Sequence, residues 1–203
     1  MLKDNAQIKI IKKPDEISFD GIHDLLWKAN QQNRERGVLL NTATMTPDEL
    51  KERVGDDGVV FVAMSRNVLV GTLSVRFVKW NKWYCHGATP EYTLIGVDPD
   101  FAGRHVCSGL MAEAEKYLLE NGWNQVLLDT AASNTHAIGV YRHIGFELID
   151  YTAYRGTDHY SVVMSRWIKK RAYSKLIVFC RYHIKKIAVT LRYKPGRIKR
   201  FSL

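Results

Sequence analysis

The segment from Glu91 to Gly122 constrains the fold of this chain more than any other part of the sequence. Residues 91–97 form an apolar, strand-like run that ends at Asp98-Pro99. Apolar residues then recur at three- and four-residue steps from Val106 to Leu118, and Asn121-Gly122 supplies a stop signal. A strand that leads through a short turn into a helix is the building unit of folds in which helices cover a sheet. We therefore expect an α/β fold.

The rest of the sequence supplies further strands and helices. Strands are expected at 7–12, 58–64, 68–78, 125–130, 146–151 and 160–164, and helices at 17–29, 47–54 and between Asn134 and Gly145. Thr46-Pro47-Asp48-Glu49 has the sequence of a capping box with proline at the first helical position. The first two helices are joined by a loop from Arg34 to Met45 that is suited to cover a substrate. The order predicts a mixed, mainly antiparallel central sheet flanked by helices on both faces.

The charge is divided unevenly along the 203 residues. The whole chain has a net charge of +9, but residues 166–203 hold 13 Lys or Arg and no Asp or Glu. The preceding residues therefore carry 17 basic and 21 acidic side chains, a balance of −4. A chain of this length suits one domain with an appended tail. We predict a globular domain over residues 1–166 and a basic extension over residues 167–203.

The basic extension has the pattern of an amphipathic helix. From Tyr173 onward its apolar positions share a helical stripe, with basic residues around them: Leu176, Ile177, Cys180, Ile184, Ile187, Ala188 and Leu191. Three interpretations stay open, namely contact with an anionic membrane surface, contact with nucleic acid, and packing against the domain or a second subunit as in a homodimer. Of the first two, the membrane is favoured over nucleic acid.

Cysteine content and hydropathy indicate a cytoplasmic protein. The three cysteines, Cys85, Cys107 and Cys180, show no CxxC spacing, which favours neither a disulfide framework nor a zinc site. Residues 1–13 lack the features of a secretory signal, and no run approaches the length of a membrane-spanning helix. The expected location is cytoplasmic, with peripheral membrane contact through the extension as an option.

The turn between Val97 and Met111 is a candidate anion site. Backbone N–H groups of such a turn converge on one point, and the N-terminus of the following helix adds positive potential. A plain crossover connection explains the same residues, since the turn contains one glycine before the helix. A second motif decides between these readings.

The second motif is Asn134-x-x-Ala137-x-x-x-Tyr141-x-x-x-Gly145-Phe146. Together with the turn, it resembles the Gcn5-related N-acetyltransferase (GNAT) family, over roughly residues 7–166 and most specifically over 97–146. The resemblance implies the acyl-CoA N-acyltransferase fold and transfer of an acetyl group from acetyl-CoA to a primary amine, without a metal and without a covalent enzyme intermediate. It does not identify the amine.

The resemblance also assigns roles to residues. The family's turn consensus, Q/R-x-x-G-x-G/A, falls here on Ala102, His105 and Cys107, so a β-carbon replaces the usual glycine at His105. The implied coenzyme-binding residues are Ile95, Gly96, Val97, Gly103, Arg104, His105, Val106, Cys107, Ser108, Asn134, Ala137 and Tyr141. A backbone N–H between Ile95 and Val97 is expected to stabilise the negative charge on the reacting carbonyl.

Two side chains are the implied catalytic residues. Tyr141 matches the general acid that protonates the departing coenzyme A sulfur, although a core tyrosine gives the same pattern. Glu91, six residues before Val97, matches the general base of histone-type family members. A base is useful because a lysine-like amine has a pKa of about 10.4 and must lose a proton before it attacks. A solvated glutamate at a strand end is the alternative reading of Glu91.

Other function classes remain as alternatives. One is a degenerate, GNAT-like adapter that has lost coenzyme binding at His105, and another is a membrane or nucleic-acid binder that acts through its basic tail. The histidines at positions 86, 136, 143 and 159 show no HExxH pattern, and no G-x-S-x-G serine motif accompanies them. The aromatic loop from Trp80 to Tyr84 fits either the wall of an acceptor pocket or a loop folded onto the sheet.

Overall fold

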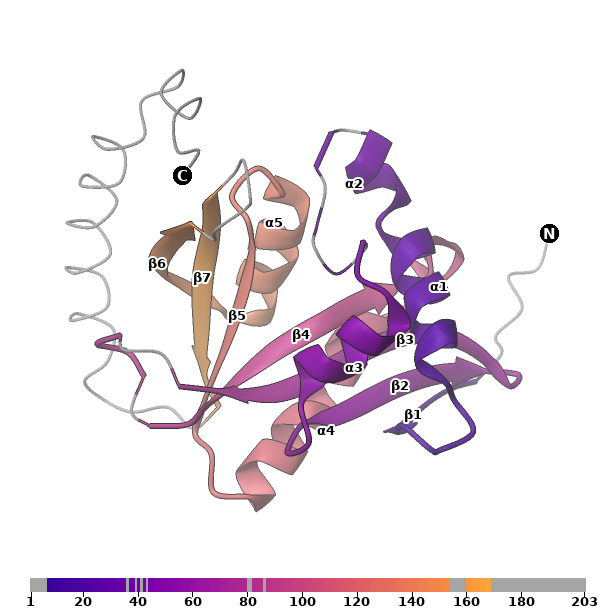
Figure 1. The fold of residues 1–203 in the computed structure, drawn as a ribbon, viewed down its shortest axis with the longest axis horizontal. Coiled ribbons are helices and arrows are strands. Elements are labelled where there is room, and N and C mark those ends of the chain that lie inside the picture. The colour runs from indigo at the N-terminus through magenta and orange to yellow at the C-terminus, as the bar shows by residue number, and fades with distance from the viewer. Residues whose placement is uncertain are drawn as a thin grey trace. The chain divides into compact units, whose positions relative to one another are not determined.

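The computed structural model describes residues 7–35, 37–38, 40, 42, 44–79, 82–85, 87–153 and 160–168. They form two compact units, one within residues 1–126 and one within residues 127–203 (Figure 1). The amphipathic helix expected from Tyr173 lies outside the described residues, as do Trp80, His86 and His159.

The first unit contains four antiparallel strands in the order β1-β2-β3-β4. Their bounds are Ile8–Lys12 for β1, Val59–Ser65 for β2, Val68–Val78 for β3 and Thr89–Val97 for β4. The connection between β2 and β3 has two residues, Arg66 and Asn67, and both have positive φ, 48° and 65°. Positive φ at both central positions is the mark of a type I′ hairpin, the tight turn expected from the sequence.

Helices cover both faces of these four strands. Helices α1 (Phe19–Ala29) and α3 (Pro47–Val54) contact β3 on one face, and α4 (Val106–Glu120) packs on the other (Figure 1). Two glycines permit the close approach. A β-carbon on Gly71 would lie 2.7 Å from Val106 of α4, and one on Gly96 would lie 2.9 Å from Leu26 of α1. Gly71 pairs with Val97 and Thr72 pairs with Gly96, so the two glycines point to opposite faces.

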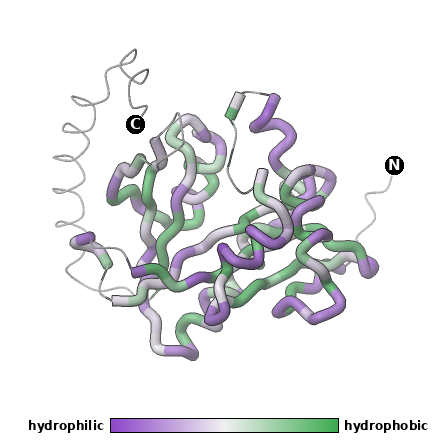
Figure 2. Tube along the Cα trace, in the orientation of Figure 1, coloured by the Kyte–Doolittle hydropathy of each residue, from purple (hydrophilic) through white to green (hydrophobic). Residues whose placement is uncertain are grey.

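The core under α1 and α3 is built from their apolar stripes and alternate strand residues. The buried members of this cluster are Ile22, Leu26, Leu50, Val54, Val60, Val62 and Leu94. Figure 2 shows β2 as largely hydrophobic and the short helix α2 (Gln31–Glu35), which buries no residue, as hydrophilic. The core therefore fixes α1 and α3 against β3 and β4, where the candidate site residues of this unit lie.

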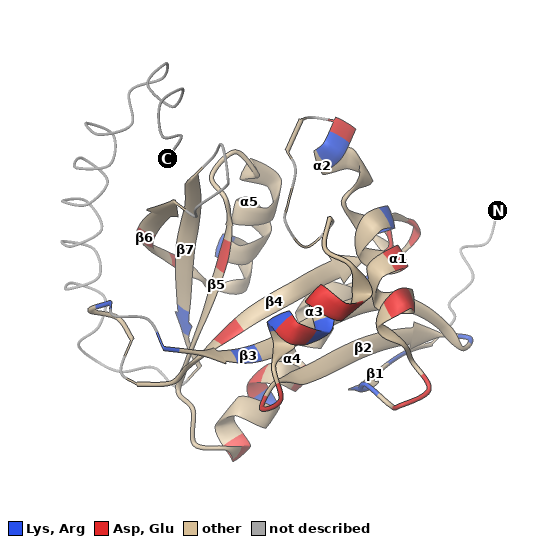
Figure 3. Ribbon diagram, in the orientation of Figure 1, with Lys and Arg blue, Asp and Glu red and all other residues tan. Residues whose placement is uncertain are grey.

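Helix α3 begins as the sequence predicts. The Thr46 hydroxyl accepts a hydrogen bond from the Glu49 backbone N–H at 3.3 Å, and the Glu49 carboxylate accepts one from the Thr46 N–H at 2.7 Å. The Thr46 N–H and the Thr46 hydroxyl both donate to the Glu49 carboxylate, which lowers the pKa of Glu49. The helix contains both acidic and basic residues, coloured red and blue on the ribbon in Figure 3.

The second unit contains β5 (Gln125–Ala131), α5 (Thr135–Ile144), β6 (Glu147–Ala153) and β7 (Tyr160–Trp167), with β5 beginning at the end of the first unit. The strand order is β5-β7-β6, and β6 pairs with β7 in antiparallel register. Asn134 caps α5, and Gly145 ends it with a positive φ of 103°, a left-handed conformation that favours glycine.

The predicted fold class is confirmed, because the strands are mostly antiparallel and helices flank them. Two short elements were not predicted. The segment 31–35 is helical, so the first two residues of the loop expected from Arg34 belong to α2. The turn after β4 contains a 3₁₀ helix, η2 (Pro99–Phe101). None of the helices in the described ranges is long and apolar enough to span a membrane.

Candidate active site

The turn between β4 and α4 has a defined backbone path. Asp98 caps η2, since its carboxylate accepts a hydrogen bond from the Asp100 N–H at 3.0 Å. Further backbone hydrogen bonds join Phe101 N–H to the Asp98 carbonyl at 2.8 Å and Ala102 N–H to the Pro99 carbonyl at 3.1 Å. Gly103 then takes a φ of 74°, in the left-handed region. The expected turn from Val97 to the start of α4 is thus tightly hydrogen-bonded.

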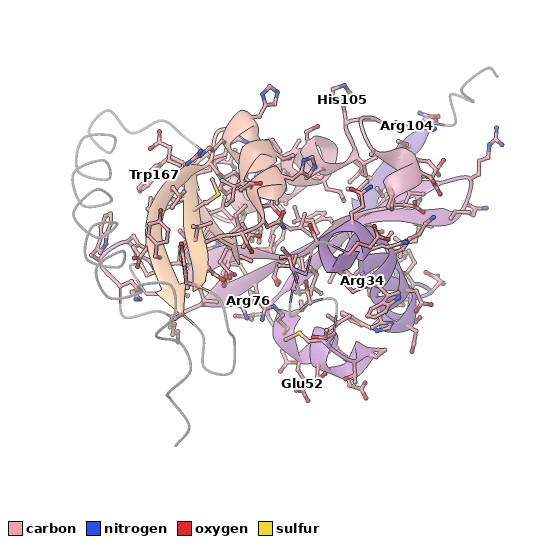
Figure 4. All side chains as sticks on the ribbon, turned by 90° about the horizontal axis from the view of Figure 1, so that it is seen from above. Arg34, Glu52, Arg76, Arg104, His105 and Trp167 are labelled. Carbon is pink, nitrogen blue, oxygen red and sulfur yellow. The ribbon has the colours of Figure 1, made fainter. Side chains whose placement is uncertain are left out.

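His105 keeps a glycine-like backbone although it has a side chain. Its φ of 60° and ψ of 18° are left-handed, which costs a non-glycine residue about 1–2 kcal/mol. Histidine tolerates this region better than most residues do. Its side chain is exposed and makes no capping hydrogen bond to α4, and Figure 4 shows the imidazole directed away from the ribbon, beside Arg104. The altered consensus position therefore has a left-handed backbone conformation, which glycine adopts at no steric cost.

The first turn of α4 follows directly after His105. Val106 is buried and packs against Gly71, which fixes the helix start, while Ser108 is exposed and donates to the His105 carbonyl at 3.0 Å. Burial raises the pKa of the Cys107 thiol to about 11, so the thiol is neutral near pH 7. A neutral thiol adds no negative charge where the helix N-terminus would attract an anion.

Strand β4 contains a bulge at the residues expected to bind the reacting carbonyl. Thr93 pairs with Ser74 and Gly96 pairs with Thr72, so Leu94 and Ile95 lie opposite one residue of β3. Leu94 has a positive φ of 49° and a side chain that is 1% exposed. Bulges interrupt the ladder and redirect backbone groups, and strained backbone of this kind is concentrated at functional sites. The bulge therefore separates β4 from β3 at Leu94–Ile95.

Glu91 is fully buried and ion-paired. It lies directly opposite Arg76 on β3, and the Arg76 Nε and Nη2 atoms lie 3.0 Å and 2.8 Å from Glu91 Oε2. The side chain of Glu91 is 0% exposed and that of Arg76 is 20% exposed. The solvated glutamate considered as the alternative is therefore wrong. The guanidinium stabilises the ionised carboxylate in a region away from bulk water.

A second arginine lies on the same face. Arg53 of α3 donates from Nε to the Thr93 hydroxyl at 2.8 Å, and Thr93 is two residues from Glu91 on β4. In the aromatic loop, Tyr84 is 4% exposed and Cys85 is 9% exposed, while the Trp83 and Tyr84 rings meet edge to face at 5.4 Å. This burial favours a loop folded onto the unit over an open pocket wall.

In the second unit, the motif residues occupy one helix. Tyr141 is 9% exposed and its ring lies 6.2 Å from that of Phe146, whose N–H donates to the Tyr141 carbonyl at 2.9 Å. Asn134 is buried and accepts a hydrogen bond from the Ala137 N–H at 3.3 Å, so it acts as the N-cap of α5. The burial of Tyr141 is consistent with both interpretations of this residue, a general acid and a core tyrosine.

Sequence reasoning missed three contacts of the first unit. These are the Arg76–Glu91 pair, the Arg53–Thr93 hydrogen bond, and a cluster in which Lys28 Nζ lies 2.9 Å from both Asp98 and Asp100. The first could be found once β3 and β4 are aligned as a hairpin, because their residues face each other in register. Among the described residues, no group of three or more His, Cys, Asp or Glu side chains is arranged to hold a metal ion.

A comparison of the chain with protein-family models agrees with the fold and with the motifs of the site. The family model described as "Acetyltransferase (GNAT) family" matches residues 19–146, a stretch that includes α1, the turn after β4, α4 and the motif of α5. The chain therefore belongs to the GNAT family of acetyltransferases, as the sequence resemblance predicted.

Two curated relatives illustrate how far sequence similarity extends. A mycothiol acetyltransferase from Saccharopolyspora erythraea is 32% identical over 107 residues, which are 50% of this chain and 33% of that protein. An acetyltransferase from Pectobacterium atrosepticum is 34% identical over 56 residues, 28% of this chain and 40% of that protein. The chain thus matches well under half the length of these relatives.

Solved structures show the same fold at low sequence identity. The ribosomal-protein-S18-alanine N-acetyltransferase from Escherichia coli aligns with a TM-score of 0.62 and 16% identity, over 83% of this chain and 98% of that chain. The PaiA N-acetyltransferase from Thermoplasma acidophilum, solved in complex with coenzyme A, aligns with a TM-score of 0.61 and 16% identity, over 79% of this chain and 99% of that chain. These alignments agree with the acyl-CoA N-acyltransferase fold.

Proposed function

We propose that this protein is an N-acetyltransferase that moves an acetyl group from acetyl-CoA to a primary amine by direct attack. The observation that carries this proposal is the left-handed backbone at Gly103 and His105, which leads into the N-terminus of α4, where backbone N–H groups and the helix dipole favour a bound diphosphate. Membership of the GNAT family and the full motif from Asn134 to Phe146 support the same activity.

The proposed steps follow from the chemistry of the acyl transfer. Glu91 accepts a proton from the ammonium form of the acceptor, directly or through water, which frees the nitrogen lone pair. The nitrogen forms a bond to the thioester carbonyl carbon, and a backbone N–H between Ile95 and Val97 stabilises the negative charge on the oxygen. The carbon–sulfur bond breaks, and Tyr141 donates its proton to the departing sulfur. The nitrogen loses its second proton, which returns through water to the Tyr141 phenolate, and the proton held by Glu91 goes to solvent. The products are an N-acetylated amine and coenzyme A.

The activity can be tested with two measurements on the full chain. At 100 times its Kd, acetyl-CoA is expected to stabilise the protein by about 2.7 kcal/mol, which raises Tm by about 5–10 °C. Release of coenzyme A thiol is then followed over a panel of primary amines that includes a polyamine, an aminoglycoside, an amino sugar and a peptide with a free N-terminus. We expect turnover with at least one class. Absence of stabilisation by acetyl-CoA would instead support the adapter interpretation, and stabilisation without turnover for any amine would contradict the proposed transfer to a primary amine.

A change at His105 is expected to strengthen coenzyme binding. In His105→Gly, the left-handed backbone is retained without its strain, and loss of the β-carbon allows the diphosphate to approach the backbone. One additional hydrogen bond to a charged group is worth about 1.5–3 kcal/mol, so we expect the Kd for coenzyme A to fall about tenfold or more in calorimetry.

The matched control for this prediction is His105→Asn. Asparagine tolerates the left-handed region but keeps a β-carbon, so its Kd for coenzyme A should stay within about twofold of the wild-type value. If His105→Gly binds coenzyme A no more tightly than His105→Asn does, the side chain at this position does not limit the approach of the diphosphate.

A further inference from the structure

Lys28 links helix α1 to Asp98 and Asp100, at the beginning of the proposed coenzyme-binding turn. It lies in the last turn of α1, and its Nζ atom lies 2.9 Å from Asp98 Oδ2 and 2.9 Å from Asp100 Oδ2. The two aspartates are about 70 residues away along the chain, at the cap and in the first turn of η2. One ammonium group therefore bridges two carboxylates that belong to the turn.

The contact with Asp98 is the better protected of the two. The Asp98 side chain is 11% exposed, whereas that of Asp100 is 76% exposed and that of Lys28 is 48% exposed. The hydrogen bonds to Asp100 and Asp98 raise the pKa of Lys28, and the hydrogen bond from Lys28 lowers the pKa of Asp100. Solvent screens the Asp100 contact, so the effect of the bridge on the turn depends mainly on Asp98.

Asp98 forms several of the hydrogen bonds at the beginning of the turn. Its N–H donates to the Val70 carbonyl of β3 at 2.9 Å, its carboxylate caps η2, and its carbonyl accepts from Phe101. The orientation of its carboxylate therefore influences the path of the chain towards Arg104 and His105. Two aspartates beside a diphosphate-binding turn would also repel the ligand, unless a cation offsets their charge.

We propose that Lys28 is a positioning residue for coenzyme A. It holds the Asp98 carboxylate in the geometry that caps η2, and it neutralises the negative charge of Asp98 and Asp100 at the beginning of the turn. This inference rests on the proposed function, since it requires the turn from Asp98 to Ser108 to bind the diphosphate. It makes α1 part of the coenzyme site through Asp98, without contact between Lys28 and the coenzyme.

The test compares three variants of the full chain by calorimetry with coenzyme A and by steady-state kinetics. Lys28→Met is expected to raise the Kd for coenzyme A and the KM for acetyl-CoA about tenfold and to leave kcat within twofold, because the reacting atoms are untouched. Lys28→Arg retains the positive charge and the donors, and should recover most of the affinity. Lys116→Met removes an exposed lysine of α4 and should leave Kd unchanged, which controls for net charge.

A double-mutant comparison separates positioning from direct contact. In an Asp98→Asn/Asp100→Asn background, Lys28→Met should change the Kd by less than about twofold, because Lys28 acts through the carboxylates. A tenfold loss that persists in this background would overturn the proposal, as would a Lys28→Met protein that binds coenzyme A as well as wild type. If the wild-type protein itself binds no coenzyme A, the proposed function fails, which is a separate outcome.

Discussion

Tyr141→Phe is expected to lower kcat about 100-fold while the Tm changes little. A positioned general acid contributes about 10²–10⁴-fold to the rate, and phenylalanine has no proton to donate to the departing sulfur. The ring is buried 6.2 Å from that of Phe146, so phenylalanine preserves the ring packing of α5. The measurement is the rate of thiol release at saturating acetyl-CoA and amine, together with a thermal melt.

Tyr117→Phe is the matched control for this prediction. Tyr117 of α4 also pairs with a phenylalanine ring, Phe61, at 6.0 Å, and no role in the reaction is assigned to it. Its kcat should equal that of the wild type. If Tyr141→Phe keeps kcat within twofold of wild type as well, Tyr141 is a core tyrosine and another group protonates the sulfur.

Glu91→Gln is expected to lower kcat/KM about 100-fold near pH 7, with a loss that shrinks as the pH rises. The variant has no base to take the proton from the ammonium form, but an amine with a pKa of about 10.4 loses that proton unaided at higher pH. The glutamine oxygen still accepts from Arg76, so the fold should be retained. The pH dependence of kcat/KM from pH 6.5 to 9.5 gives the result.

Glu113→Gln is a control for this prediction, because Glu113 is an exposed residue of α4. It should leave the pH profile unchanged. Glu91→Ala, in contrast, leaves the Arg76 guanidinium without its partner, and breaking such a buried pair costs about 3–5 kcal/mol of stability. A Glu91→Gln loss of equal size at every pH would indicate that Glu91 is a structural partner of Arg76 and not a base.

Local sequence signals predicted those elements whose ends are set by their own residues. Strand β3 has the predicted bounds, and α3 begins with the predicted capping box. Helix α5 is capped by Asn134 and ended by Gly145, because a capping side chain and a left-handed glycine act within one turn of the chain. In the two helices the deciding hydrogen bonds join residues three or four positions apart.

Short elements without apolar periodicity were not predicted. Helix α2 has the polar sequence QQNRE and buries no residue, so no apolar periodicity marks it. It is held by side chains, since Asn33 donates to Asn30 at 3.1 Å and the Arg34 guanidinium stacks 3.7 Å from the centre of the Trp27 ring. Pairings of this kind require the folded chain.

Motifs supplied the candidate site residues but did not predict the geometry around them. The turn, Glu91 and Tyr141 were identified from motifs, but the left-handed Leu94 has no sequence signal, because leucine disfavours that conformation. The bulge exists because β3 and β4 pair on both sides of it, and the buried Leu94 side chain joins the core under α1 and α3. The ion pairs of Lys28 and Arg76 likewise depend on register and helix packing.

The central claim is that the turn from Asp98 to Ser108 binds the diphosphate of coenzyme A although histidine occupies the glycine position. The most direct test compares the Kd of coenzyme A with that of pantetheine, which lacks the diphosphate and the 3′-phosphoadenosine joined to it, by calorimetry on the full chain. Two hydrogen bonds from backbone N–H groups to a charged ligand predict that coenzyme A binds at least about 100-fold more tightly. Equal affinity for the two ligands, or no binding of coenzyme A, would contradict the account.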